Sequence, residues 1–177
     1  RHGQALAGSA QFFAQSGRWQ RCLMWYKQNS LLLKKLQSGM TPLVLDLFCK
    51  AGGVSAGATR AGVSVFGVDI EKQPSYVARF GTEVFELGDA TDMSMLRGLV
   101  RKYKPVLVWA SVPCAGYSTA PHLGEASRTA RMIGEMRAIL MSLGLPYVIE
   151  NVGGARASMH EPFELFGQYF GLRQDRL

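Results

Sequence analysis

A cysteine and a glutamate carry the side chains in this sequence best suited to covalent and acid–base chemistry. Cys114 follows a proline and precedes Ala-Gly in the loop-like segment Val112–Ser118, a context that favours an exposed thiol, and a thiolate is a nucleophile. Glu150 ends the apolar run Pro146–Glu150. A carboxyl group enclosed there would have a raised pKa and would donate a proton. The plainer alternatives are a buried structural cysteine and a glutamate that is exposed or paired.

Three further motifs follow apolar runs in the manner of nucleotide-binding sites. The segment Asp46–Gly53 (DLFCKAGG) places glycines where the backbone must approach a nucleotide closely, although it is not the GxGxxG of pyrophosphate sites. Asp69 ends a second run about twenty residues later, where a carboxylate accepts hydrogen bonds from ribose hydroxyls. Asp89, in Gly88–Ala90, follows a third run and could bind an adenine amino group. Each motif alone also fits a tight turn or a helix cap, but their agreement predicts a nucleoside site.

Short apolar runs alternate with helical stretches from Leu43 onward, and the strands and helices that they predict must position the motifs. The expected strands are residues 43–48, 63–69, 83–87, 106–111 and 146–150. The expected helices are residues 55–61, 73–80, 91–103, 126–143 and 162–170. Strands that are apolar on both faces, with helices between them, predict an α/β fold with a mostly parallel sheet and helices on both faces. Because parallel strands end at one edge, we expect the motifs to meet there.

The length and the charge distribution predict one core with a basic arm. A chain of 177 residues can bury a full core without disulfides. Residues 1–45 hold six basic residues and no acidic ones, whereas residues 46–177 hold fourteen basic and thirteen acidic residues. We therefore expect residues 40–177 to form the core and residues 1–39 to form a basic N-terminal extension. That extension either follows a phosphate backbone or is a plain solvated arm.

Several classes of protein do not fit the composition. The longest near-apolar run, Val106–Ala115, is shorter than the roughly 20 residues that span a membrane. The N-terminus lacks a secretory pattern, and the three scattered cysteines fit a reducing compartment better than a disulfide framework. We expect a soluble cytoplasmic monomer without a metal site.

Taken in order, DLFCKAGG, Asp69, GDA, PCAGYS and ENV resemble the motifs of the DNA (cytosine-5)-methyltransferases over residues 43–177. The resemblance implies a Rossmann-like methyltransferase fold that binds S-adenosyl-L-methionine. Within that mapping, Asp69 holds the ribose, Ile70 packs on the adenine, and Asp89 with Ala90 binds its amino edge. The complete set of implied cofactor-binding residues is Phe48, Cys49, Gly52, Gly53, Asp69, Ile70, Asp89, Ala90 and Pro113.

The same resemblance implies an activity, DNA (cytosine-5-)-methyltransferase, of the kind found in restriction–modification systems. Cys114 would add to C6 of a cytosine flipped out of double-stranded DNA, and Glu150 would act at N3. Ser118 and Arg176 would contact the DNA. The alternatives are a tRNA cytosine-5 methyltransferase of the same family and a catalytically silent fragment that binds the cofactor or DNA.

Three departures from the family pattern affect these expectations. Lys50 stands where the family usually has Gly, and its side chain could reach the carboxylate of the cofactor. Ala115 stands where the family usually has Gln. In the tail FGLRQDRL only Gln174 and Arg176 match the family's Gln-x-Arg-x-Arg segment. The family places its target-recognition region beyond this point. We therefore expect residues 1–177 to bind the cofactor without measurable methylation on their own.

Overall fold

The computed structural model describes residues 41–117 and 131–166. By its internal contacts the chain divides into two compact units, residues 1–42 and 43–177, and the elements described below belong to the second. The predicted basic extension, Ser118 and Arg176 lie outside the described residues. Their roles therefore stay predictions.

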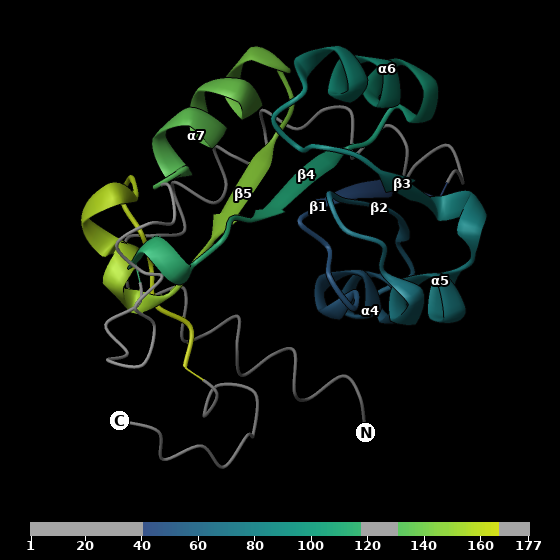
Figure 1. Cartoon of the computed structure of the whole chain (residues 1–177), viewed down its shortest axis with the longest axis horizontal. Coiled ribbons are helices and arrows are strands. Elements are labelled where there is room, and N and C mark those ends of the chain that lie inside the picture. The colour runs from purple at the N-terminus through teal and green to yellow at the C-terminus, as the bar shows by residue number, and fades with distance from the viewer. Residues whose placement is uncertain (1–40, 118–130, 167–177) are drawn as a thin grey trace. The chain divides into compact units, whose positions relative to one another are not determined.

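A parallel sheet of five strands forms the centre of the described unit (Figure 1). Every neighbouring pair is parallel, and the order in space is β3-β2-β1-β4-β5. The strands are β1 (Leu43–Leu47), β2 (Ser64–Asp69), β3 (Phe85–Leu87), β4 (Leu107–Ser111) and β5 (Tyr147–Glu150). The strand order reverses between β1 and β4, and open α/β sheets bind ligands at such a switch point, outside the carboxyl ends of the strands.

Among the described residues, four helices cover the sheet, two on each face (Figure 1). The helices α4 (Gly53–Arg60) and α5 (Pro74–Phe80) lie on one face, and α6 (Met93–Tyr103) and α7 (Ile133–Ser142) lie on the other. Short 3-10 turns complete the fold: η1 (Thr82–Val84), η2 (Ala115–Tyr117) and η3 (Gly153–Ser158). The predicted Rossmann-like α/β fold, with a parallel sheet and helices on both faces, is thereby confirmed.

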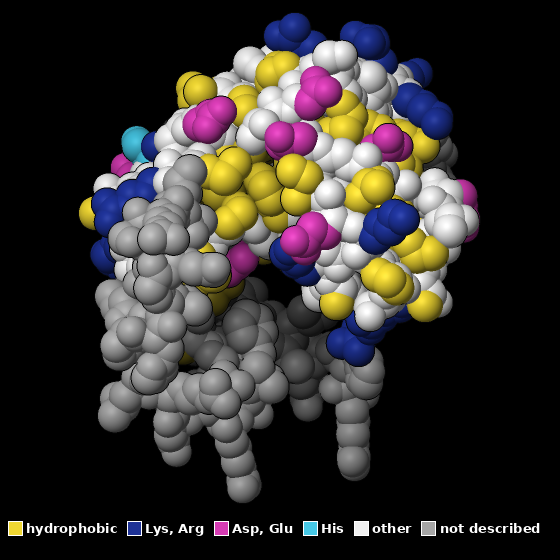
Figure 2. Space-filling view, viewed as in Figure 1, with side chains coloured by type: hydrophobic (Ala, Val, Ile, Leu, Met, Phe, Trp, Pro, Cys, Tyr) yellow, Lys and Arg dark blue, Asp and Glu magenta, His cyan; other side chains and the backbone are white. Residues whose placement is uncertain are grey.

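The main hydrophobic core lies between the sheet and the pair α6 and α7. Its fully buried members alternate along the strands and recur at helical spacing: Leu45, Leu47, Val68, Val108, Ala110, Leu96, Ile133, Met136 and Leu140. At the start of α6, Asp92 accepts hydrogen bonds from the backbone N–H groups of Ser94 and Met95, as an N-cap does. Arg101 and Lys102 in the last turn of α6 complement the helix dipole, and Figure 2 shows basic side chains on the outer surface there.

Two predicted helices are wrong in part. The helix predicted over residues 126–143 begins at Ile133, because Arg131 and Met132 are not helical. Residues 126–130 of the same prediction lie outside the described part. The helix predicted over residues 162–170 is absent from residues 162–166, which follow the left-handed Glu161 (φ 46°). The apolar side chains of that segment are mostly exposed, at 51–68%. Burial of an apolar face is the main stabilisation of a helix this short, and side chains that stay this exposed supply little of it.

A buried hydrogen-bond network joins β1, α4 and α5. The Ser55 hydroxyl donates to Oδ2 of Asp46 at 2.7 Å and lies 3.1 Å from the Tyr76 hydroxyl, and the Ser55 N–H donates to the same Asp46 oxygen at 3.2 Å. Oδ1 of Asp46 has no partner among the described residues. Burial raises the pKa of Asp46 to about 6, because removal from water disfavours the charged form.

The Tyr76 ring is fully buried and lies against the backbone of two glycines. A Cβ on Gly67 of β2 would stand 2.5 Å from Cζ of Tyr76. A Cβ on Gly52, before α4, would stand 2.9 Å from Cδ2 of the same ring and 2.5 Å from Phe80. All three distances are far below van der Waals contact, so the position of α5 requires glycine at residues 52 and 67.

We predict that Gly67→Ala lowers the free energy of unfolding by about 1–3 kcal/mol, because the added methyl group displaces the Tyr76 ring. Gly57→Ala is the matched control, since Gly57 lies in α4 and a Cβ at this position would meet no atom within 4 Å. It should raise the free energy of unfolding by about 0.5–1 kcal/mol. Urea unfolding followed by circular dichroism measures both, and equal stability of the two variants would contradict the packing account.

We predict that Asp46 makes the protein less stable as the pH rises. The folded pKa is raised from 3.8 to about 6, so the stability present below pH 3.8 is lost as the pH passes through 6, a loss of about 3 kcal/mol. Asp46→Asn cannot ionise and keeps an oxygen for Ser55. The difference between the free energies of unfolding of the variant and the wild type should therefore grow from pH 4 to pH 7. Parallel pH profiles in urea unfolding would show that Asp46 is not the titrating group.

Candidate active site

The motif residues lie at the carboxyl edge of the sheet, where the strands end. The loop Phe48–Gly53 follows β1, Asp69 ends β2, Gly88–Ala90 follows β3, and Glu150 ends β5. Backbone hydrogen bonds join three of these segments, from the Cys49 N–H to the Val68 carbonyl at 3.1 Å and from the Gly88 N–H to the Asp69 carbonyl at 2.9 Å. The structure therefore brings the segments after β1, β2 and β3 together.

The loop after β1 turns sharply, because three of its residues have left-handed backbones. These are Phe48 (φ 59°), Lys50 (φ 45°) and Gly52 (φ 80°). The Gly52 N–H donates to the Cys49 carbonyl at 2.8 Å and closes the turn. Gly53 opens α4, and a Cβ there would meet no atom within 4 Å, so the loop leaves open space in front of that helix. A lysine in the left-handed region is strained, since side chains other than those of Gly, Asn and Asp disfavour it.

Asp69 holds this loop in place. Its Oδ2 accepts the Lys50 N–H at 3.0 Å, its Oδ1 accepts the Glu71 N–H at 3.1 Å, and the residue is 2% exposed. The carboxylate expected to hold the ribose is thus engaged by two backbone donors and covered. Its role in holding the loop is one that the sequence alone did not indicate.

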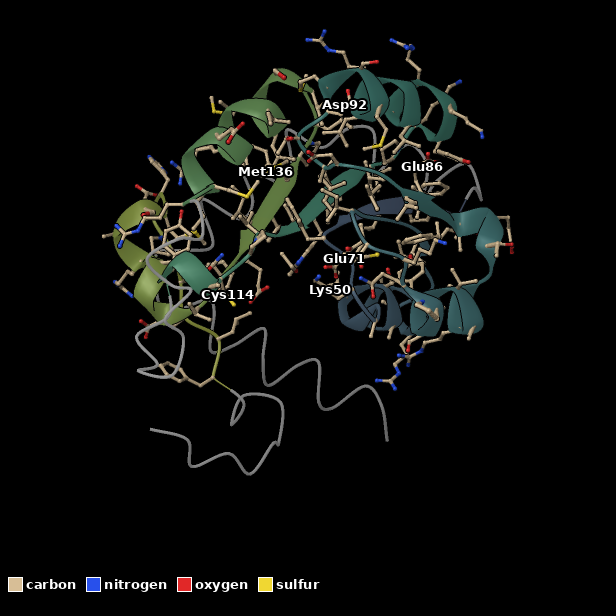
Figure 3. All side chains as sticks on the ribbon, in the orientation of Figure 1. Lys50, Glu71, Glu86, Asp92, Cys114 and Met136 are labelled. Carbon is tan, nitrogen blue, oxygen red and sulfur yellow. The ribbon has the colours of Figure 1, made fainter. Side chains whose placement is uncertain are left out.

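Lys50 and Glu71 form an ion pair beside Asp69 (Figure 3). The Lys50 Nζ donates to Oε2 of Glu71 at 3.1 Å and stands 3.9 Å from Oδ1 of Asp69. The hydrogen bond to Glu71 and the two carboxylates raise the pKa of Lys50 above its ordinary value. The lysine expected to reach a cofactor carboxylate therefore pairs with carboxylates of its own chain.

The edge beyond β2 and β3 offers an apolar surface and a free acceptor. Ile70 is 65% exposed directly after β2, and Leu87, paired in register with Asp69, is 49% exposed at the end of β3. Oδ1 of Asp89 accepts hydrogen bonds from the N–H and the hydroxyl of Thr91, both at 2.8 Å, whereas Oδ2 accepts none from the described residues. Ala90, the next residue, is buried. An adenine ring fits such a surface, because it has apolar faces and a donor amino group.

The two described cysteines differ in their surroundings. Cys49 is buried, and burial, with Asp46 and Asp69 nearby, raises the pKa of its thiol to about 12. That residue stays a neutral thiol at physiological pH. Cys114 is exposed after β4, behind the half-buried Pro113. Of the two, Cys114 alone has the access that a nucleophile needs.

Cys114 and Glu150 follow neighbouring strands that are tied together at their ends. Ser111 of β4 pairs in register with Glu150 of β5, and the Asn151 side chain donates to the Val112 carbonyl at 2.8 Å. Glu150 is exposed rather than enclosed in the described structure, so the enclosure that its predicted role as a proton donor requires is not present there. The chemistry of this carboxyl group therefore needs a ligand that covers it.

The segment that carries Cys114 is anchored to the start of α7. The Tyr117 hydroxyl accepts the Ile133 N–H at 3.1 Å, and the Arg131 Nε donates to the Gly116 carbonyl at 3.2 Å. These bonds fix η2 and, with it, the backbone that follows Cys114.

Four residues of this site were not found from the sequence. Glu71 and Leu87 were within reach of sequence reasoning, since each stands beside a motif residue at a strand end. Asn151 belongs to the ENV motif, but its bond to Val112 depends on strand pairing. The position of Tyr76 against two glycines depends on the packing of α5, which the sequence pattern does not specify.

The described part of the chain lacks two further features. Within residues 41–117 and 131–166, no group of three or more His, Cys, Asp or Glu side chains could hold a metal ion. Over those same ranges, no helix is long and apolar enough to cross a membrane.

Comparison with known proteins gives relatives among methyltransferases. The chain is 29% identical over 118 residues to Type II methyltransferase M.HgiGI of Herpetosiphon aurantiacus, a match that covers 64% of this chain and 93% of that protein. It is 28% identical to Type II methyltransferase M.HgiDI of the same organism, over 64% of this chain and 38% of that protein. The chain thus spans less than half of the second relative.

A solved structure has the same fold. The methyltransferase EhMeth of Entamoeba histolytica matches 66% of this chain and 40% of its own length, with a TM-score of 0.50 and 17% sequence identity. At that identity the match concerns the fold alone. The family model for C-5 cytosine-specific DNA methylase matches residues 43–169, which is more than half of the chain. The resemblance carried by the motifs is therefore confirmed, and this chain belongs to the C-5 cytosine-specific DNA methylase family.

Proposed function

We propose that this protein transfers a methyl group from S-adenosyl-L-methionine to C5 of a cytosine in DNA. One observation carries the proposal: an exposed cysteine and an exposed glutamate follow two paired strands, β4 and β5, at the same sheet edge as the glycine-rich loop. Family membership supplies DNA as the substrate class. A tRNA substrate has no comparable support, and an intact thiol and carboxyl group argue against a silent fragment.

The residues after β1, β2 and β3 fit the cofactor. The loop after β1 would enclose the methionine part of the cofactor through Phe48, Cys49, Gly52 and Gly53. The ribose of the cofactor would lie beside Asp69. Ile70 supplies the apolar surface for the adenine, and Oδ2 of Asp89, beside Ala90, supplies an acceptor for the amino group. Pro113 would border the end of the cofactor that faces the cysteine. When bound, S-adenosyl-L-methionine supplies an electrophilic methyl group.

The residues after β4 and β5 activate the base. C5 of cytosine is a poor nucleophile, so the Cys114 thiolate adds to C6 while the Glu150 carboxyl group donates a proton to N3. The resulting enamine is nucleophilic at C5. After C5 is methylated, the C5 proton passes to water, the thiolate leaves C6, and the N3 proton returns to the Glu150 carboxylate, which restores the aromatic ring. Glu150 is exposed in the described structure, and the bound base would be the group that covers it.

The DNA must present its base outside the helix. C6 is inaccessible in a stacked duplex, so the cytosine is flipped out, at a cost of a few kcal/mol that contacts with the DNA offset. Ser118 and Arg176 are our candidates for such contacts, together with the basic residues 1–39. The protein would act as a monomer.

We predict that native alkylation distinguishes the two described cysteines. With a pKa of about 12 against an ordinary 9.0, Cys49 has a thiolate fraction on the order of a thousandfold lower near pH 8. Iodoacetamide should modify Cys114 in the folded protein and Cys49 only after unfolding. Peptide mass spectrometry of timed samples measures both rates, and comparable rates in the native protein would contradict the assignment of Cys114 as the accessible thiol.

We predict a covalent adduct between Cys114 and 5-fluorocytosine DNA. Fluorine at C5 cannot leave as a proton would, so the methylated base stays attached to the thiol. A single-stranded oligonucleotide removes the cost of unstacking. The trapped adduct accumulates from a single reaction event, so intact mass spectrometry with S-adenosyl-L-methionine present should detect it even where residues 1–177 show no measurable turnover. Cys114→Ala should abolish it, and Glu150→Gln should slow it at least about a hundredfold, the lower end of the contribution of general acid–base catalysis, which is on the order of 10²–10⁴-fold.

Cofactor binding is the control for these variants. Calorimetry should give dissociation constants for S-adenosyl-L-methionine within about twofold of the wild type, because Cys114 follows β4, Glu150 ends β5 and neither belongs to the loop after β1. Loss of binding in both variants would assign a structural role to the pair. An adduct that persists in Cys114→Ala would remove the cysteine from the mechanism.

A further inference from the structure

The Lys50–Glu71 ion pair lies across the edge at which the proposed cofactor would place its ribose (Figure 3). The Lys50 Nζ is within 4 Å of two carboxylates, at 3.1 Å from Oε2 of Glu71 and 3.9 Å from Oδ1 of Asp69. Asp69 is 2% exposed, so a ribose hydroxyl cannot reach it in this arrangement.

We propose, on the basis of the proposed function, that the Lys50 ammonium competes with the ribose hydroxyls of the cofactor for the carboxylates of Asp69 and Glu71. The pair must open before the cofactor is fully seated. Lys50 thereby lowers the affinity for every ligand that carries this ribose and sets the concentration at which the site fills.

The backbone fixes the lysine in this position. The Lys50 N–H donates to Oδ2 of Asp69, which places the root of the side chain beside that carboxylate. The left-handed backbone at φ 45° belongs to the turn that the whole loop makes, so the side chain starts from a defined point. The ammonium then reaches Glu71, two residues after Asp69 on the neighbouring segment.

The exposure of the pair limits the size of the effect. The Lys50 and Glu71 side chains are 64% and 70% exposed, so water and salt screen their attraction. Exposed ion pairs contribute little, and breaking one corresponds to a change in affinity of about two- to fivefold. Such a pair can open on binding, which suits a competitor rather than a permanent barrier.

The test uses three variants of the full chain. Lys50→Asn removes the charge and tolerates the left-handed backbone, so it separates the ion pair from the turn. Lys50→Arg keeps a cation at the same place. Lys72→Ala removes another exposed charge, one residue beyond Glu71, and controls for net charge. Calorimetry measures binding of S-adenosyl-L-methionine and S-adenosyl-L-homocysteine, which share the ribose but differ in the sulfonium charge.

We expect Lys50→Asn to bind both ligands about two- to fivefold more tightly than the wild type. Lys50→Arg and Lys72→Ala should stay close to the wild type. Raising the salt from low to moderate concentration should tighten binding to the wild type, because screening opens the pair, and should leave Lys50→Asn unchanged.

Unchanged or weaker binding by Lys50→Asn would overturn the inference, since the lysine would then be neutral or an anchor. A gain confined to S-adenosyl-L-methionine, or one that Lys72→Ala reproduces, would show charge repulsion in place of competition. These outcomes leave the proposed function intact. Absence of binding to both ligands in the wild type and in every variant would instead contradict the proposed function itself.

Discussion

The close packing of the Tyr76 ring on two glycine backbones is the contact on which the candidate cofactor site depends. The ring lies where a Cβ of Gly52 or Gly67 would stand, so α5 sits directly against the loop after β1 and against β2. Its hydroxyl lies 3.1 Å from Ser55, which in turn donates to Asp46. The loop after β1 therefore packs on the Tyr76 ring and is held by the buried hydrogen bonds among Asp46, Ser55 and Tyr76. Its open side is left to a ligand.

Two buried carboxylates hold the loop from its two ends. Asp46 accepts from Ser55 at the start of α4, and Asp69 accepts from the backbone of Lys50. Burial first, and then the charges of Asp46 and Asp69, raise the pKa of the Cys49 thiol, which keeps it neutral and unreactive. The negative charge gathered here favours a cation at the site. In the described structure the Lys50 ammonium takes that place. The same acids that shape the loop therefore also attract the side chain that covers them.

The sequence predicted the strands, the sheet type and the edge at which the motifs meet. It did so because hydrophobic runs and turn residues act locally, and because parallel strands must end together. The helix predicted over residues 162–170 failed in residues 162–166, where the large apolar side chains are more than half exposed. The Asp69 carboxylate, whose predicted role toward a ribose stays a prediction, also lies buried under its own loop, which the sequence did not indicate. Contacts between segments distant in sequence decide such outcomes, and local patterns do not encode them.

The strand order divides the carboxyl edge into two chemical halves. Segments after β3, β2 and β1 carry the acids, the glycines and the apolar surface, and hydrogen bonds between them fix their relative positions. Segments after β4 and β5 carry Cys114 and Glu150 and are joined by the bond from Asn151 to Val112. Since β1 pairs with β4, the two halves meet at the switch point of the sheet. A methyl donor held by one half and a base held by the other would approach each other there, so we expect the proposed transfer to take place between the ends of β1 and β4.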